Sequence, residues 1–98
     1  MKVVTIVATA ELRERVEKDL WSLGVRDMAI GKVDGVSAHG HRRPSFLDSG
    51  NVRIETLVDG AVAAKILERV VQDYEGQEIV AYAGDVEAVP RSRFPGGQ

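Results

Sequence analysis

The chain has 98 residues, of which 44% are apolar and 29% charged, and its formal net charge is -2. These values are typical of one ordinary globular domain, and they argue against disorder and against the broad basic surface that nucleic-acid binding usually needs. Because the chain contains no cysteine, disulfides, zinc-thiolate sites and thiol nucleophiles are excluded.

The sequence gives no sign of a membrane or export segment. No apolar run approaches the roughly 20 residues that a membrane-spanning helix needs. The N-terminus also lacks the basic head and apolar core of a signal peptide. We therefore expect a cytoplasmic protein that does not insert into membranes.

The chain is expected to begin with a strand and a helix. Residues 1–8 are dense in β-branched side chains with little polar alternation, which predicts a strand that is central in a sheet or covered on both faces. Thr9 offers an N-cap oxygen for a helix with regularly spaced apolar residues that ends at Gly24. Trp21 lies next to the apolar stripe, and we interpret it as a packing residue rather than a ligand platform.

Two further strands are expected around a long loop. The second strand runs over about 27–36, where Gly31 and Gly35 indicate a bulge or a close approach to the backbone. The loop over 37–50 is about a dozen residues long, and such loops in small domains are more often functional than idle. Strict alternation over 51–58 predicts a third strand with one face on a core.

The last two elements are a helix and a strand. Asp59 opens the helix, whose apolar residues follow the i, i+3, i+4, i+7 pattern, and Gly76 closes it. The last strand spans about 78–89, with a bulge expected at Gly84 and Asp85.

The order of these elements predicts the fold. Two strand-helix-strand units, each with a right-handed crossover, give an α+β, ferredoxin-like βαββαβ domain with a four-stranded antiparallel sheet and both helices on one face. The other face needs a cover. Apolar residues on both faces of the first strand, and Leu57 opposite the core face of the third, indicate that sister subunits provide it.

The loop contains a segment suited to binding an anion. Residues 35–43 hold both histidines, two adjacent arginines, a serine and two glycines, with no acidic residue. Glycine-rich turns leave backbone amides accessible, and flanking arginines supply positive charge. Arg91 and Arg93 could grip the same anion, since residues two apart in an extended segment point the same way. Taken alone, such loops are often merely solvated.

Other chemistries fit the residues less well. His39 and His41 invite a metal site, but zinc needs a third ligand, and the nearest acids, Asp34 and Asp48, have no recognisable ligand spacing. A histidine general base lacks a poised nucleophile. The acylphosphatase chemistry of this fold needs an arginine and an asparagine that the loop over 8–11 lacks. An RNA platform would need paired aromatics on central strands, which are absent here.

Five segments together resemble the PII-like signal proteins in their order and spacing. They are residues 2–5, 23–28, 32–35, 51–55 and 86–93. The resemblance covers nearly all of the chain. It implies a homotrimer of ferredoxin-like domains over 1–94, with 36–50 as the T-loop of the family and 95–98 as a flexible tail.

The resemblance also implies a non-enzymatic protein that binds adenine nucleotides in clefts between subunits. The residues that it assigns to nucleotide binding are Gly35, Val36, Ser37, Leu57, Val58, Asp59, Arg91 and Arg93. The residues that it assigns to anion binding in the T-loop are His39, Gly40, His41, Arg42 and Arg43. The resemblance implies neither a cofactor nor a metal.

The chain departs from the PII pattern in ways that change the expected ligand. The loop over 37–50 is short and has no modifiable tyrosine, and the segment 74–77 is too brief to wrap a triphosphate. AMP or ADP is therefore favoured over ATP, and uridylylation and 2-oxoglutarate sensing are not expected.

The short basic loop is most similar to the PII-like branch associated with carboxysomes and bicarbonate transport. That branch implies bicarbonate as a second ligand, association with the carboxysome as an option, and a protein partner in inorganic-carbon metabolism. The T-loop would change order on ligand binding and so present or hide a docking surface. The alternative is a divalent-metal-binding trimer, PII-like or CutA-like, that uses His39 and His41.

Overall fold

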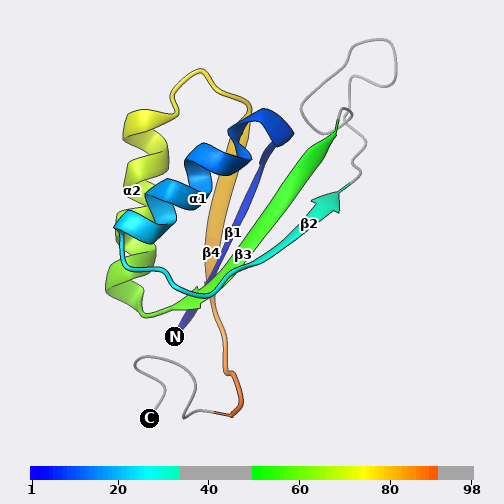
Figure 1. Cartoon of the computed structure of the whole chain (residues 1–98). Coiled ribbons are helices and arrows are strands. Elements are labelled where there is room, and N and C mark those ends of the chain that lie inside the picture. Colours follow the sequence, from blue (N-terminus) through cyan, green and yellow to red (C-terminus); the bar gives the residue numbers. More distant parts are fainter. Residues whose placement is uncertain (34–49, 91–98) are drawn as a thin grey trace.

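The computed structural model describes residues 1–33 and 50–90, and its elements follow the predicted order (Figure 1). They are β1 (Lys2–Thr9), the 3-10 turn η1 (Ala10–Leu12), α1 (Arg13–Ser22), β2 (Ala29–Val33), β3 (Asn51–Val58), α2 (Gly60–Asp73) and β4 (Ile79–Asp85). The strands form one antiparallel sheet in the order β2-β3-β1-β4, with both helices on one face. The predicted α+β, ferredoxin-like βαββαβ fold is confirmed.

Alternation along the central strands decides which side chains form the core. In β1, Val4, Ile6 and Ala8 are almost fully buried and belong to the core cluster that the helices cover. In β3, Val52 and Ile54 lie on the same side, while Arg53 and Glu55 alternate with them and are exposed. The predicted central first strand and the predicted one-sided third strand are therefore both confirmed.

The helices cover this core through short apolar stripes. Val16 and Leu20 are the buried residues of α1, and Ala63 and Ile66 are those of α2. Asp59 begins α2 as predicted, because its Oδ1 accepts a hydrogen bond of 2.8 Å from the Val62 amide. This bond satisfies one of the amide donors that a helix start leaves without a partner.

The start of the first helix differs from the prediction. Thr9 is in extended conformation before the 3-10 turn, and its hydroxyl makes no capping hydrogen bond. The α-helix itself starts only at Arg13. Trp21 is not a packing residue of the core either, since it is 57% exposed on the last turn of α1.

Neither the bulge predicted at Gly84 and Asp85 nor the bulge alternative at Gly31 is present in the described strands. Gly31 pairs with Arg53 in an unbroken β2-β3 register. Gly84 and Asp85 pair with Val3 and Lys2 in an unbroken β1-β4 register, and the strand simply ends there. The glycines therefore lie near the ends or on the edges of the sheet without interrupting its pairing.

The second face of the sheet carries no helix, and we call it the helix-free face. By register it includes Val3, Thr5 and Val7 of β1 and their partners Val80 and Tyr82 of β4. Val80 and Tyr82 are 44% and 56% exposed, although both have large apolar groups. By register the same face also carries the exposed Arg53 and Glu55 of β3, so it is apolar over β1 and β4 and charged over β3.

None of the helices in the described part of the chain is long and apolar enough to cross a membrane.

Candidate functional site

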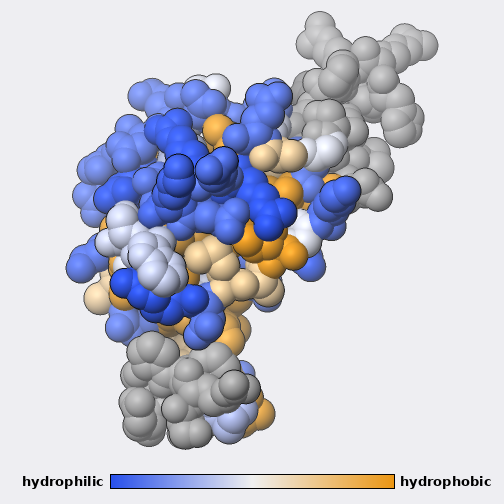
Figure 2. Space-filling model, viewed as in Figure 1, coloured by the Kyte–Doolittle hydropathy of each residue, from blue (hydrophilic) through white to orange (hydrophobic). Residues whose placement is uncertain are grey.

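A pocket of about 450 Å³ lies where the connection between α1 and β2 passes the C-terminal end of β3. Its volume is within the range of about 300–1,000 Å³ that is usual for small-molecule sites. The residues that line it are Gly24, Val25, Arg26, Asp27, Met28, Ala29, Glu55, Thr56, Leu57 and Val58. Figure 2 shows apolar surface, in orange and tan, exposed beside the largely hydrophilic surface of α1.

Gly24 directs the chain into the wall of this pocket. Its φ of 100° is left-handed, a conformation that glycine adopts without steric cost. The amides of Gly24 and Val25 donate to the carbonyls of Trp21 and Leu20 at 3.1 and 3.0 Å, which ends α1. Val25 is then buried in the core, so the residues after it are held close to the sheet.

A single hydrogen bond fixes this connection against β3. The Thr56 hydroxyl donates to the Asp27 carbonyl at 2.7 Å. β2 begins only at Ala29, opposite Glu55. The pocket therefore lies at the point where the chain approaches β3 but has not yet joined it in the sheet.

The end of β3 offers backbone hydrogen-bonding groups to a ligand. Residues 56–58 extend beyond the start of β2, and within the described residues they have no strand partner on that side. Backbone N–H and C=O groups that lack a partner bind other donors and acceptors readily. A flat ring with donors and acceptors along its edge fits such an arrangement.

The charged groups of the pocket favour a neutral ring over a phosphate. Arg26 is the one basic residue of the described lining, and Asp27 and Glu55 are acidic. Glu55 also accepts a hydrogen bond of 3.4 Å from the Thr5 hydroxyl. Two carboxylates against one guanidinium make a poor environment for a dianion, so a phosphate would be bound outside this part of the pocket.

The structure tests only part of the predicted nucleotide site. Leu57 and Val58 line the pocket as the resemblance implied, whereas the carboxylate of Asp59 caps α2. The predicted residues that lie outside the described part are Gly35, Val36, Ser37, His39, Gly40, His41, Arg42, Arg43, Arg91 and Arg93. Their roles stay predictions.

Sequence reasoning missed the other wall of the pocket, formed by 24–29. The sequence signal there is a helix-ending glycine followed by the charged pair Arg26 and Asp27. That signal marks a loop but does not show that the loop lies over a strand end. Only the register of β2 with β3 places it there.

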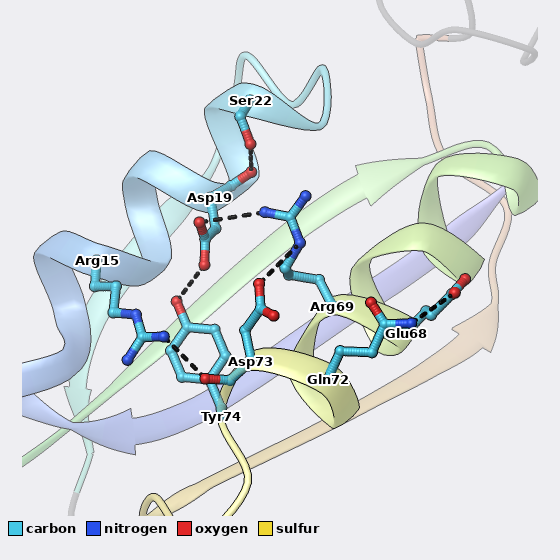
Figure 3. A network of polar contacts seen from close by, with 8 residues as sticks. All are labelled: Arg15, Asp19, Ser22, Glu68, Arg69, Gln72, Asp73 and Tyr74. Atoms are coloured by element: carbon cyan, nitrogen blue, oxygen red, sulfur yellow. Dashed lines mark hydrogen bonds and ion pairs between the residues drawn. The ribbon is translucent and has the colours of Figure 1, made fainter.

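A second polar cluster joins the two helices (Figure 3). Asp19 of α1 accepts a 2.6 Å hydrogen bond from the Tyr74 hydroxyl and pairs with Arg69 of α2 at 3.3 Å. Arg69 also pairs with Asp73 at 3.3 Å. Burial and the Asp19 carboxylate raise the pKa of Tyr74 well above its usual value, so the hydroxyl stays protonated. Each of these side chains has a partner within the cluster, so we interpret the cluster as a structural contact that holds α1 against α2.

The metal alternative gains no support from the described residues. In the ranges 1–33 and 50–90, no group of three or more histidine, aspartate or glutamate side chains could hold a metal ion. His39 and His41 lie outside these ranges, so the alternative itself is untested.

The structure thus combines a ferredoxin-like fold with a pocket at the edge of its sheet. The sequence matches the family Nitrogen regulatory protein P-II over residues 1–93, and the chain belongs to this family. It is therefore a PII-like signalling protein and not an enzyme, as the resemblance implied.

Solved structures of PII-like proteins are similar to this chain. One, described as a PII-like signalling protein from Thermus thermophilus, is 30% identical with a TM-score of 0.78, over 96% of this chain and 94% of that one. CPII from Thiomonas intermedia, bound to ADP, AMP and bicarbonate, is 20% identical with a TM-score of 0.71, over 87% and 88%. CPII bound to ADP, AMP and acetate is 18% identical with a TM-score of 0.76, over 95% and 92%. No curated protein matches the sequence.

Proposed function

We propose that this protein is an adenylate-sensing PII-like regulator that binds AMP or ADP with the base in the pocket between the α1-β2 connection and β3. The observation that carries the proposal is the position of Leu57 and Val58. The family resemblance assigns both to the base site, and both line the pocket.

The chemistry of the pocket supports a purine ring. Its volume of about 450 Å³ exceeds what a base needs, and Val25, Met28 and Leu57 supply apolar surface. The strand-free edge of residues 56–58 supplies backbone groups of the kind that pair with the edge of a base. The phosphates would extend away from Asp27 and Glu55, toward the positive charge that the sequence predicts at Arg91 and Arg93.

The helix-free face supports assembly into the predicted trimer. Val80 and Tyr82 expose apolar area on a sheet face without a helix, and a domain of this size gains stability from an interface. Two further copies of the chain are the proposed cover. Each site would then lie in a cleft between neighbouring subunits.

Signalling would run through the T-loop to a protein partner in inorganic-carbon metabolism, with bicarbonate as a second ligand. CPII, which shares the fold, is described as bound to ADP, AMP and bicarbonate. That similarity motivates the bicarbonate arm of the test below. The link to the carboxysome rests on the short basic loop of the sequence alone.

The proposal is tested by thermal-shift titration of the full chain with AMP, ADP, ATP and cyclic AMP, with GDP and pyrophosphate as controls for base and phosphate. A ligand at about 100 times its Kd adds about 2.7 kcal/mol to the free energy of unfolding. We expect AMP and ADP to stabilise most. Stabilisation by none of the adenine nucleotides would contradict the proposal.

The bicarbonate arm uses the same titration with and without saturating ADP. A further shift by bicarbonate, and none by chloride at equal ionic strength, is the expected result. Equal shifts by both anions would remove bicarbonate from the proposal and leave the adenylate site in place.

A further inference from the structure

Arg26 is held in one orientation at the wall of the pocket. Its guanidinium lies over the Trp21 ring, 4.0 Å from the ring centroid. Its Nη1 donates hydrogen bonds of 2.8 Å to the Trp21 carbonyl and 3.0 Å to the Val25 carbonyl. An arginine side chain is otherwise flexible, so these three contacts pre-organise a planar cation beside the pocket that it lines.

A structural role explains only part of this arrangement. A cation at the last carbonyls of α1 favours the helix, because it offsets the negative end of the helix dipole. That role needs the charge and one donor, and a lysine would provide both. Stacking on an indole uses the plane of the guanidinium, which has a second, opposite face.

We propose that the second face of the Arg26 guanidinium stacks on the base of the bound nucleotide, so that Trp21, Arg26 and the base form a continuous stack. This inference rests on the proposed adenylate site and adds a residue that selects for a flat ring. Trp21 holds the arginine plane in place, although it is itself 57% exposed.

The chain offers a matched control for this arrangement. Arg15 also stacks on an aromatic ring, 4.4 Å from the centroid of Tyr74, and donates a 2.8 Å hydrogen bond to the Asp73 carbonyl at the end of α2. It does not line the pocket. Arg26→Lys and Arg15→Lys therefore each replace a planar guanidinium stacked on an aromatic ring by an ammonium group that has no plane. One change lies beside the pocket and the other away from it.

The experiment is calorimetric titration of wild type and both variants with ADP. Arg26→Lys keeps the charge and loses the planar stack, and we expect it to raise the Kd roughly 3- to 30-fold, which is the range that one cation-π contact covers. We expect Arg15→Lys to leave the Kd unchanged. Equal affinity of Arg26→Lys and wild type would overturn the stack and leave the adenylate site standing. A wild type that binds no adenine nucleotide would overturn both.

Trp21 supplies a second measurement that needs no variant. It is the single tryptophan of the chain, so indole fluorescence reports on this place alone. We expect saturating ADP to change the emission of wild type, and ribose 5-phosphate with pyrophosphate, which carry no base, to leave it unchanged. Unchanged emission at calorimetric saturation with ADP would also overturn the stack.

Discussion

The hydroxyl of Tyr74 connects the two helices at a buried point. Tyr74 is 2% exposed, and its hydroxyl donates to Asp19 at 2.6 Å (Figure 3). Tyr74→Phe removes this bond and leaves one oxygen of a half-buried carboxylate without its donor. We expect the free energy of unfolding to fall by about 1.5–3 kcal/mol, the usual range for a hydrogen bond to a charged group. Chemical denaturation at pH 7 measures it.

The same variant has a distinct pH dependence. Folding raises the pKa of Tyr74, so the tyrosine contributes its full stability below the unfolded pKa of about 10 and loses it as pH rises from there. Wild type should therefore lose stability faster than Tyr74→Phe above about pH 10. If the free energies of unfolding of wild type and Tyr74→Phe changed in parallel with pH, the raised pKa of Tyr74 in the folded protein would be contradicted.

At the level of elements, Asp59 at the start of α2 has two roles to distinguish: a helix cap, which the structure shows, and a nucleotide ligand, which is a prediction. Asp59 was predicted to bind nucleotide, yet its Oδ1 accepts from the Val62 amide. Asp59→Ala should lower the free energy of unfolding by about 0.5–2 kcal/mol, whereas Asp59→Asn, an equally good N-cap, should change it little. Denaturation of both variants measures the cap. ADP titration of the stable Asp59→Asn variant then decides the binding role.

Some elements were predictable because local sequence alone determines them. The alternation of β3 and the Asp59 cap of α2 depend on neighbouring residues, and both predictions are confirmed. The bulge predicted at Gly84 was wrong, and of the two alternatives predicted at Gly31, a bulge or a close approach to the backbone, the bulge was wrong. A glycine weakens a strand without showing whether its partner stays in register. The prediction that Trp21 packs in the core was also wrong, because local sequence does not show which tertiary neighbour a side chain meets. Its neighbours on the helix do not reveal that Arg26 covers its ring.

The candidate site was only half predictable for a physical reason. Leu57 and Val58 end a strand whose pattern is visible in the sequence. The facing wall, 24–29, has no periodicity, and it becomes a wall only through tertiary contacts such as the bond from Thr56 to Asp27. Local propensity contains no information about such contacts.

At the level of the whole molecule, the helix-free face should determine the assembly. Val80→Asp places a charge on this face, where Val80 is 44% exposed. We expect it to convert the proposed trimer to monomer in sedimentation velocity, because burying an unpaired carboxylate costs several kcal/mol. Val71→Asp, on the outer surface of α2 where Val71 is 73% exposed, is the matched control and should sediment like wild type. A trimeric Val80→Asp would place the interface elsewhere.

The position of β2 has a mechanical consequence for the protein. Ala29 lines the pocket, and Val33, where the strand ends, lies four residues and about 13 Å farther along it. β2 is an edge strand with β3 as its single neighbour in the described sheet, so half of its backbone groups take no part in the ladder. A ligand beside Ala29 would thus contact the first residue of an edge strand that is hydrogen-bonded on one side. The last residue of this strand, Val33, is followed in the sequence by residues 34–49. Because Ile30 of β2 packs against the core cluster, a displacement of the strand would also be felt in the core.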